Sequence, residues 1–392
     1  MARRFELDWL RVLAILTVFV AHCSRFFDPE VWHVKNARTY PGLEIVAGVL
    51  VTWLMPLIFV ISGASSFYSL RKGAARFVSD RVKRLLVPLV VGVFTHAMIG
   101  VYLEQVTQHY FRGSLTDFVP HYFDGLLFFG GNFAWMGLHL WYLEWLLVYS
   151  LVCLPFFLWL AAGSGRRLLT RLASLLATPL GPYLLALPGT LLIPFLNPRS
   201  LFLGDRGWGG WSLPMYLFFF VAGFLVISND AVRDRIRRQR WPSLAAGLLF
   251  LAAVGALMVT QDEPRFGTVE YALQVVLHSL ASWCCVLGIL GLGTHYLNIP
   301  RPWLLYANEA VLPFYILHQT VILCIGYYVV RWPIPDLLKY GVILVSSFAV
   351  TMGLYELLVR RVNLLRFLFG MKPLPRRAEV GAAGQPAAGI QA

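Results

Sequence analysis

The chain has 392 residues, of which 58% are apolar and 14% are charged, and its mean hydropathy is +0.66. Because soluble domains carry about a quarter charged residues, this composition excludes an ordinary soluble protein and predicts an all-α, polytopic membrane bundle. The net charge of +13 does not indicate a nucleic-acid partner, since the Lys and Arg residues form short clusters between apolar segments.

About ten apolar segments are predicted to be transmembrane helices, because roughly 20 apolar residues cover the ~30 Å hydrocarbon core of a bilayer. The fifth segment contains four prolines, which are expected to kink or break a helix. The predicted spans are residues 7–27, 45–70, 85–104, 138–162, 172–195, 212–227, 242–260, 271–296, 304–330 and 338–359.

The basic residues predict the orientation of the chain in the membrane. Regions on the same side as the N-terminus hold 23 of the 33 Lys and Arg residues, and the alternate loops hold nine. The positive-inside rule therefore predicts that both termini are cytoplasmic. Residues 1–373 are predicted to form one integral-membrane domain, and the Ala/Gly-rich residues 374–392 a disordered cytoplasmic tail.

The first span carries three ionisable residues, Asp8, Arg11 and His22. Asp8 and Arg11 are three positions apart, and His22 follows eleven positions after Arg11, which brings it to nearly the same helix face ~16 Å further along. Such a polar stripe inside a membrane usually faces a bundle interior and marks a functional path. The alternative is a snorkelling Arg11 and a hydrogen-bonded core His22.

A basic cluster lies between the second and third spans and contains Arg76, Arg81 and Arg84. Guanidinium groups bind phosphate oxygens in a bidentate fork, so this cluster is a candidate site for a phosphate-bearing donor. The alternative is ordinary anchoring to anionic lipid headgroups.

Further polar residues lie in or near later spans and are candidates for a shared pocket, because intramembrane polar groups seldom face lipid. Ser62 belongs to a run of small residues that favours close helix packing, with a pore lining as the alternative. Glu144 is the deeper carboxylate of its span and is expected to have a partner. The full set is His33, Ser62, His139, Trp141, Glu144, His318, Gln319 and Glu356, while His96, His109, His121, His278 and His295 are expected to be structural.

Several of these stretches resemble the membrane acyltransferase family 3. The ten residues between Arg11 and His22 match the first-helix signature of that family, and the other similar stretches are residues 59–63, 76–88, 139–143 and 315–319. Residues 32–34, 354–356 and 364–373 resemble the glucan-biosynthesis protein C branch of the family. The resemblance extends from residue 5 to residue 373.

This resemblance implies a multi-pass enzyme of the bacterial inner membrane. It would move an acyl group, acetyl- or succinyl-like, from cytoplasmic acyl-CoA to a hydroxyl of an extracytoplasmic glycan or glucan. Acyl-CoA would be a substrate, with no tightly bound cofactor and no metal; the sequence contains no Walker loop, Rossmann fingerprint or zinc motif.

Ester transfer needs a base for the acceptor hydroxyl and a group that stabilises the developing oxyanion. His22 is the expected base, Asp8 would hold Arg11, and Arg11 would steer the donor. His318 and His139 are further candidates for base or oxyanion donor.

Two alternatives remain open from the sequence. A covalent acyl-enzyme could form on Ser62 or His22 instead of direct transfer. A transporter or flippase could use the polar stripe as a solute or proton path, but its usual mark, an inverted internal repeat, is not evident in the sequence.

Overall fold

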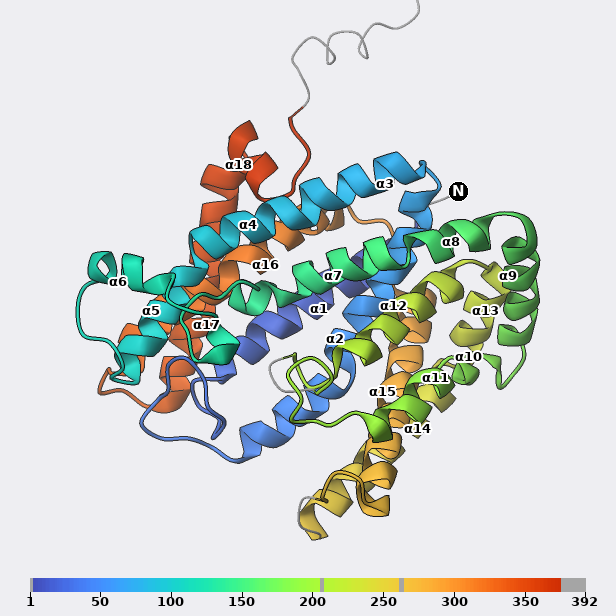
Figure 1. The fold of residues 1–392 in the computed structure, drawn as a ribbon, viewed down its shortest axis with the longest axis horizontal. Coiled ribbons are helices and arrows are strands. Elements are labelled where there is room, and N and C mark those ends of the chain that lie inside the picture. Colours follow the sequence, from blue (N-terminus) through green and yellow to red (C-terminus); the bar gives the residue numbers. More distant parts are fainter. Residues whose placement is uncertain (1–2, 205–207, 261–263, 375–392) are drawn as a thin grey trace, which may run out of the picture.

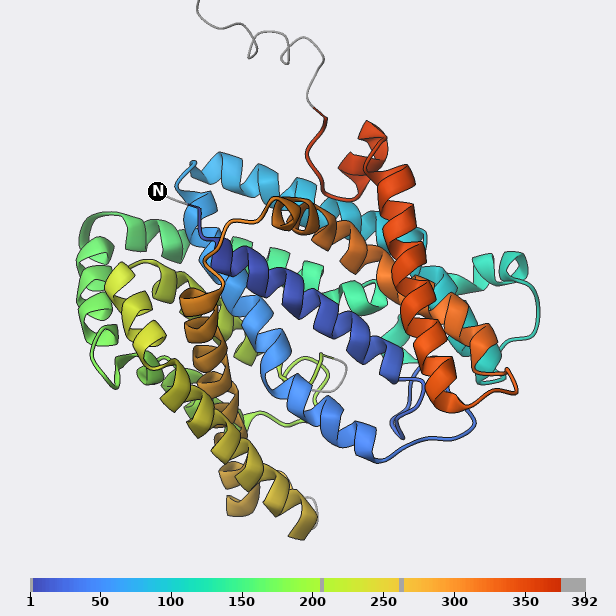
Figure 2. The same ribbon diagram turned by 180° about the vertical axis from the view of Figure 1, so that it is seen from behind.

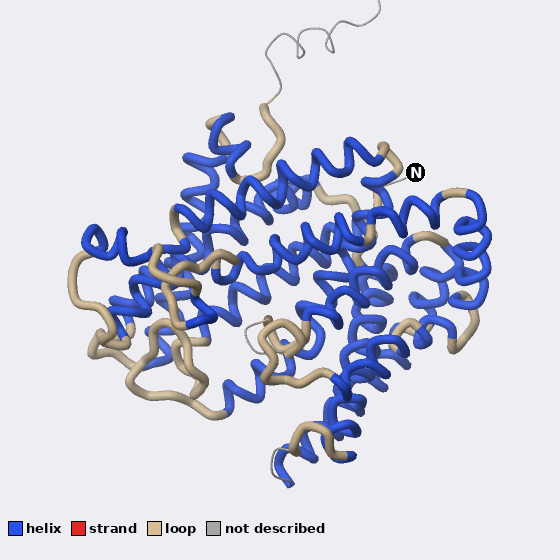
Figure 3. The backbone as a smooth tube through the Cα atoms, viewed as in Figure 1, coloured by secondary structure: helices blue, strands red, loops and turns tan. Residues whose placement is uncertain are grey.

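The computed structural model describes residues 3–204, 208–260 and 264–374. Within these residues the chain consists of helices and connecting loops (Figure 3), and the single extended pairing is an isolated bridge between Leu126 and Phe133. This result confirms the prediction of an all-α protein.

Five long helices form the centre of the bundle (Figures 1 and 2). Helix α1 packs against α2, α15 and α16, and α2 also packs against α12 and α15. Between such apolar helices the stabilising term in a membrane is mainly van der Waals packing. The five are α1 (Phe5–Ser24), α2 (Gly42–Leu70), α12 (Leu213–Ile227), α15 (Val269–Tyr296) and α16 (Pro302–Val329).

Helices α2 and α12 approach each other closely through two glycines. A Cβ atom added to Gly63 would lie 1.8 Å from the backbone oxygen of Phe220, and one added to Gly223 would lie 2.0 Å from that of Val60. Neither position can hold a side chain without moving a helix. The prediction that the small residues near Ser62 serve close helix packing is confirmed.

Seven helical stretches among the described residues are long and apolar enough to cross a membrane, or up to nine if each bent pair is one span. The multi-pass architecture is therefore supported, but the predicted number of about ten is not confirmed. The seven are Phe5–Ser24, Gly42–Leu70, Ala74–Thr107, Arg240–Met258, Val269–Tyr296, Pro302–Val329 and Asp336–Val359. The bent pairs are Leu138–Val152 with Leu154–Ala161, at 46°, and Leu213–Ile227 with Asp230–Arg238, at 106°.

The third of these stretches is not one regular helix. It contains a π-helical turn in the basic region and a break at Thr95 and His96, and π-helical turns occur frequently at functional sites. Its parts are α3 (Ala74–Arg81), η1 (Val82–Leu86), α4 (Val87–Phe94) and α5 (Ala97–Thr107).

The predicted fifth span, residues 172–195, is divided into short helices instead of one membrane helix. Pro182, Pro188 and Pro194 each lie in the first turn of one of these pieces. Proline is favoured there and breaks a helix interior, so the prolines explain the division. The pieces are α9 (Gly163–Leu176), α10 (Gly181–Leu184), α11 (Leu187–Leu192) and η4 (Ile193–Phe195).

Among the remaining elements, α14 packs along α15 and α17 packs along α16. Helix α6 and the turns η2 and η3 lie in the long connection from α5 to α7, and α18 packs against α4 and η5. They are α6 (Leu115–Tyr122), η2 (Leu127–Phe129), η3 (Leu138–Leu140), α7 (Trp141–Val152), α8 (Leu154–Ala161), α13 (Asp230–Arg238), α14 (Arg240–Thr260), α17 (Asp336–Leu354), η5 (Tyr355–Val359) and α18 (Asn363–Leu368).

The basic helices and the connecting loops occupy opposite ends of the bundle. In Figure 1, α3, α18 and the start of α1 lie along the upper edge, whereas the α1–α2 loop and the α16–α17 turn lie at the lower left. The assignment of the basic end to the cytoplasm remains a prediction. The predicted disordered tail lies outside the described residues from residue 375 onward.

Candidate active site

The C-terminal end of α1 and the middle of α16 bring two histidines together. The Nδ1 atom of His22 lies 3.1 Å from the Nε2 atom of His318, and the stacked rings have centroids 5.2 Å apart. His318 is completely buried, whereas His22 is only partly buried. The two histidines predicted to be catalytic are therefore neighbours, although 296 positions separate them in the sequence.

The hydrogen bonds fix which nitrogen of each ring carries a proton. Nδ1 of His318 lies 2.6 Å from the carbonyl oxygen of Tyr315, and because a carbonyl only accepts, this nitrogen donates. In neutral His318, Nε2 then has a free lone pair and accepts from the Nδ1–H of His22. The Nε2 atom of His22 consequently keeps its lone pair, as a general base requires.

Two more histidines extend this cluster from the other side of α16. Nε2 of His139 lies 3.1 Å from the carbonyl oxygens of both Tyr315 and Ile316, and its ring centroid is 5.2 Å from that of His318. The ring of His96 lies 6.4 Å beyond His139, at the break between α4 and α5. His96 was expected to be a structural residue. Its position inside an apolar segment is the sequence feature that could have indicated a place near the cluster.

Arg11 lies nearer the basic end and joins three helices. It donates to the Ser65 hydroxyl of α2 at 2.7 Å and to the Asn308 side-chain oxygen of α16 at 3.1 Å. Asp8 lies 3.7 Å from Arg11 but accepts a shorter bond, 2.8 Å, from Arg3. The expected Asp8–Arg11 pair is thus present as a secondary contact, and Ser65 and Asn308 are the closer partners that hold the guanidinium.

Polar side chains of α2 lie between Arg11 and the histidines. Arg81 donates to the Ser66 hydroxyl at 2.8 Å, one position beyond Ser65. One turn further along α2, the Ser62 hydroxyl lies 2.6 Å from the hydroxyl of Tyr142. The ring of Tyr142 is 5.8 Å from that of Tyr315, whose carbonyl accepts from His318. These side chains lie between the basic end of the bundle and the histidine cluster.

The three arginines predicted to bind a donor do not lie together. Arg81 is in the interior, where its Nε atom is buried without a hydrogen-bond partner among the described residues. Arg84 lies in η1, close enough to Arg81 and Arg11 for mutual repulsion. Arg76 is exposed on α3. Arg11 and Arg81 are partly buried and Arg84 is exposed beside them. This grouping of three guanidinium groups at the basic end favours an anionic ligand.

Three other predicted pocket residues lie apart from the histidines. Trp141 packs 5.5 Å from the ring of Tyr216 in the aromatic core. Glu144 was expected to have a partner, but its Oε2 atom is buried without one among the described residues. Glu356 pairs with Arg360 at 2.7 Å in the C-terminal part of the chain, at the basic end.

His33 and Gln319, also predicted from the sequence, meet beside the histidine pair. The Nε2 atoms of the two side chains are 3.3 Å apart, and Nδ1 of His33 bonds to the carboxylate of Glu104 in α5. Glu104 was not among the predicted residues, because nothing in its local sequence distinguishes it from an exposed carboxylate at the end of a span.

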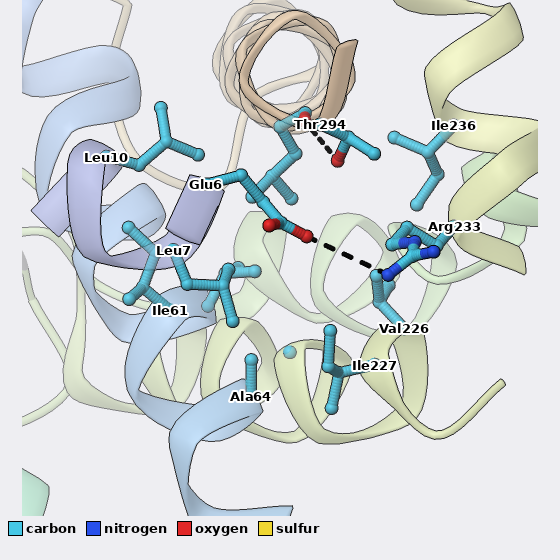
Figure 4. Close-up of a pocket in the computed structure, with 13 residues that line it drawn as sticks. Glu6, Leu7, Leu10, Ile61, Ala64, Val226, Ile227, Arg233, Ile236 and Thr294 are labelled. Atoms are coloured by element: carbon cyan, nitrogen blue, oxygen red, sulfur yellow. Dashed lines mark hydrogen bonds and ion pairs between the residues drawn. The ribbon is translucent and has the colours of Figure 1, made fainter. Parts of the chain in front are cut away.

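A separate pocket lies at the basic end, between α1, α2, α12, α13 and α15 (Figure 4). Its walls are largely apolar, and Glu6 faces Arg233 across it at 3.8 Å. Both carboxylate oxygens of Glu6 lack a hydrogen-bond partner among the described residues. This pocket does not include the histidine cluster. In the same described residues, no group of three or more His, Cys, Asp or Glu side chains is arranged to hold a metal ion.

The fold is thus a multi-pass helical bundle with a histidine cluster among its helices and an arginine group toward its basic end. The Acyltransferase domain family (acyltransferase family 3) matches residues 4–356, which is nearly the whole chain. The chain therefore belongs to this family and is an acyl-transferring membrane enzyme.

Several relatives that match over nearly the whole chain share one name. The chain is 24% identical to the glucans biosynthesis protein C of Salmonella heidelberg (strain SL476) over 97% of this chain and 98% of the relative. It has the same identity and coverage to the proteins of that name from Salmonella schwarzengrund (strain CVM19633) and Salmonella enteritidis PT4 (strain P125109). No solved structure matches the chain significantly.

Proposed function

We propose that the protein transfers an acyl group from cytoplasmic acyl-CoA to a hydroxyl of an extracytoplasmic glycan or glucan. The observation that carries this proposal is the free Nε2 lone pair on His22, which the bonded chain from Tyr315 through His318 orients. A partly buried imidazole held in this way is a suitable general base for a sugar hydroxyl.

The donor would bind at the basic end. Arg11, Arg81 and Arg84 provide three guanidinium groups, and Arg81 has an unused buried Nε–H that could donate to a phosphate oxygen. His22 lies eleven positions after Arg11 on α1, ~16 Å further along the helix. The phosphates of coenzyme A would therefore stay near the arginines while the thin pantetheine arm carries the thioester toward His22. Acyl-CoA acts here as a substrate, and the proposal includes no tightly bound cofactor.

The transfer follows from this arrangement. His22 Nε2 removes the proton from the acceptor hydroxyl, and the oxygen attacks the thioester carbonyl carbon. The tetrahedral intermediate collapses as the C–S bond breaks, and the coenzyme A thiolate takes the proton from His22. Atoms and charge balance without a further reactant. His318 keeps the correct nitrogen of His22 available and stabilises the imidazolium that forms.

Direct transfer is favoured over a covalent acyl-enzyme on Ser62. The Ser62 hydroxyl donates to the Ile58 carbonyl at 2.8 Å and pairs with Tyr142. Neither partner is a base of the kind that activates a serine nucleophile.

The proposed acceptor is based on the names of the relatives, and the proposed compartment is based on the distribution of charge. The relatives are named for glucan biosynthesis, and the excess of Lys and Arg on the side of both termini favours a cytoplasmic basic end. The histidine end would then face the outer side of a bacterial inner membrane, where a glucan would be modified. The donated group would be acetyl- or succinyl-like.

The test is transfer across a sealed membrane. Inverted vesicles that contain the protein receive labelled acetyl-CoA or succinyl-CoA outside and hold glucose oligosaccharides inside. Labelled oligosaccharide ester inside the vesicles is expected with intact protein and absent from vesicles without it. Movement of unesterified label into the vesicles, with no ester formed, would contradict the proposal and favour a transporter.

A further inference from the structure

The loop between α1 and α2 places two aromatic residues beside the catalytic histidine. The ring centroid of Trp32 lies 6.4 Å from that of His22, and the ring of His33 lies 5.5 Å from that of Trp32. Both loop residues are partly exposed. This loop is at the end of the bundle opposite the basic helices (Figure 1).

Buried ionic contacts hold the first part of this loop in place. Asp28 is 1% exposed and accepts from Arg25 at 2.6 Å and from Lys35 at 2.8 Å. Trp32 and His33 lie between these anchors, so their positions are fixed before any ligand arrives. A site arranged in advance loses less entropy on binding.

The second part of the loop is anchored to α17. Lys339, itself buried, donates to the side-chain oxygen of Asn36 at 3.0 Å. The Tyr40 hydroxyl donates to Asp336 at 2.9 Å, and this bond raises the pKa of that phenol above its ordinary value. The loop is therefore bonded to the bundle on both sides of Trp32 and His33.

A hydrogen-bonded chain runs from α5 through this loop to α16. The carboxylate of Glu104 accepts from Nδ1–H of His33, which leaves Nε2 of the ring as an acceptor. The amide nitrogen of Gln319 lies 3.3 Å from that nitrogen. The amide therefore turns its NH₂ toward His33 and its oxygen the other way. Gln319 directly follows His318, which holds the base.

We propose that Trp32, His33, Glu104 and Gln319 form the subsite for the sugar unit that carries the acceptor hydroxyl. The inference rests on the proposed function and specifies the acceptor side of that same site. The apolar C–H face of a sugar ring packs on the indole of Trp32. The amide oxygen of Gln319 accepts from a sugar hydroxyl, and the Glu104–His33 pair sets the direction of the amide.

The carboxylate of Glu104 is thus a positioning group that does not touch the reacting atoms. Without its negative charge, either nitrogen of His33 can carry the proton, and the Gln319 amide loses its preferred direction. The two hydrogen-bonded histidines, His22 and His318, do not depend on Glu104 for their contacts, so their arrangement stays intact. Loss of the Glu104 charge should therefore weaken acceptor binding more than it slows the chemical step.

The experiment compares Glu104→Gln with wild-type protein in nanodiscs, using glucose oligosaccharides as acceptors and acetyl-CoA or succinyl-CoA as donors. The matched control is Glu44→Gln, which removes an exposed carboxylate at the start of α2. For Glu104→Gln the acceptor KM should rise on the order of tenfold, with kcat and the donor KM nearly unchanged. Trp32→Ala should raise the acceptor KM similarly, and Trp32→Phe should recover part of the loss.

Equilibrium binding of the labelled oligosaccharide without donor provides a second measurement. Weaker binding by Glu104→Gln than by wild type and Glu44→Gln is expected. Equal binding by all three proteins, or an increase in the donor KM alone, would overturn the subsite while leaving the transferase function in place. Wild-type protein that binds the oligosaccharide but forms no ester would contradict the proposed function and not the subsite.

Discussion

Arg81 and Arg76 lie on the same helix, α3, and provide a matched test of the donor site. Arg81 is partly buried, donates to Ser66 at 2.8 Å and has a free buried Nε, whereas Arg76 is exposed. Arg81→Gln removes one partly buried charge, and because the Gln amide nitrogen ends near the position of the Arg Nε atom, two bonds short of the terminal nitrogens, it also removes the bond to Ser66. Arg76→Gln makes the same chemical change on the surface.

The expected magnitude follows from the contact that is removed. A hydrogen bond to a charged group contributes about 1.5–3 kcal/mol, so Arg81→Gln should raise the dissociation constant for acyl-CoA roughly 10- to 150-fold. Arg76→Gln should change it by about fivefold or less, because an exposed charge contributes roughly 0–1 kcal/mol. Isothermal titration of acyl-CoA into purified protein in nanodiscs measures both constants.

Salt provides an internal control for this comparison. Surface charges are screened at high ionic strength and interior ones much less, so the difference between the two variants should persist at about 0.5 M salt. Equal dissociation constants for Arg81→Gln and Arg76→Gln, with both proteins folded, would refute the reasoning. Anchoring to lipid headgroups would then be the better explanation for this cluster.

Two further predictions concern the helix crossing and the loop beyond α5. Gly63→Ala should reduce the yield and thermal stability of the protein, because its Cβ would lie 1.8 Å from the Phe220 oxygen, whereas Gly48→Ala on the same helix meets nothing within 4 Å; equal melting temperatures would show that the crossing is not tight. Hydrogen bonds from Ser114 hold the pKa of Asp117 below its ordinary value. Asp117 therefore stabilises the start of α6 at pH values above the pKa of this residue in the unfolded chain. The stabilisation is lost as the pH falls through the lower pKa of the folded state. Hydrogen exchange in α6, corrected for intrinsic rates, should show this acid-induced opening in wild type, and Asp117→Asn should be insensitive to pH over the same range.

The sequence was sufficient to find residues whose character is unusual for a membrane span. His22, His318 and Arg11 were identified because an ionisable group inside a membrane span is energetically costly and usually serves a function. The structure brings the two histidines into contact. Hydropathy also located the central helices, since length and composition determine whether a segment can span a bilayer.

Partners far apart in the chain could not be inferred in the same way. Arg11 is held by Asn308, 297 positions away, and an ordinary asparagine near a helix end carries no signal of that contact. Glu104 reaches His33 for a similar reason: only the fold shows that α5 passes the first loop. Proximity of this kind depends on how helices pack, which a single sequence does not encode in its local pattern.

The division of residues 172–195 shows a further limit of hydropathy. The segment is apolar enough to span a membrane, but its prolines fix the backbone at the start of each short helix. Mean hydropathy over a window of residues counts the apolar side chains but does not register the missing N–H groups of the prolines. The prolines predicted a break, but the positions of the pieces required the structure.

The central claim is that His22 is the general base of acyl transfer, and one measurement tests it most directly. Ester formation from acyl-CoA and a glucose oligosaccharide is followed with purified protein in nanodiscs for wild type and His22→Gln. An amide keeps similar size and hydrogen bonding but cannot take the proton, so turnover should fall roughly 10²- to 10⁴-fold while acyl-CoA binding stays near the wild-type level. Wild-type turnover by folded His22→Gln would contradict the account and assign the base to His318.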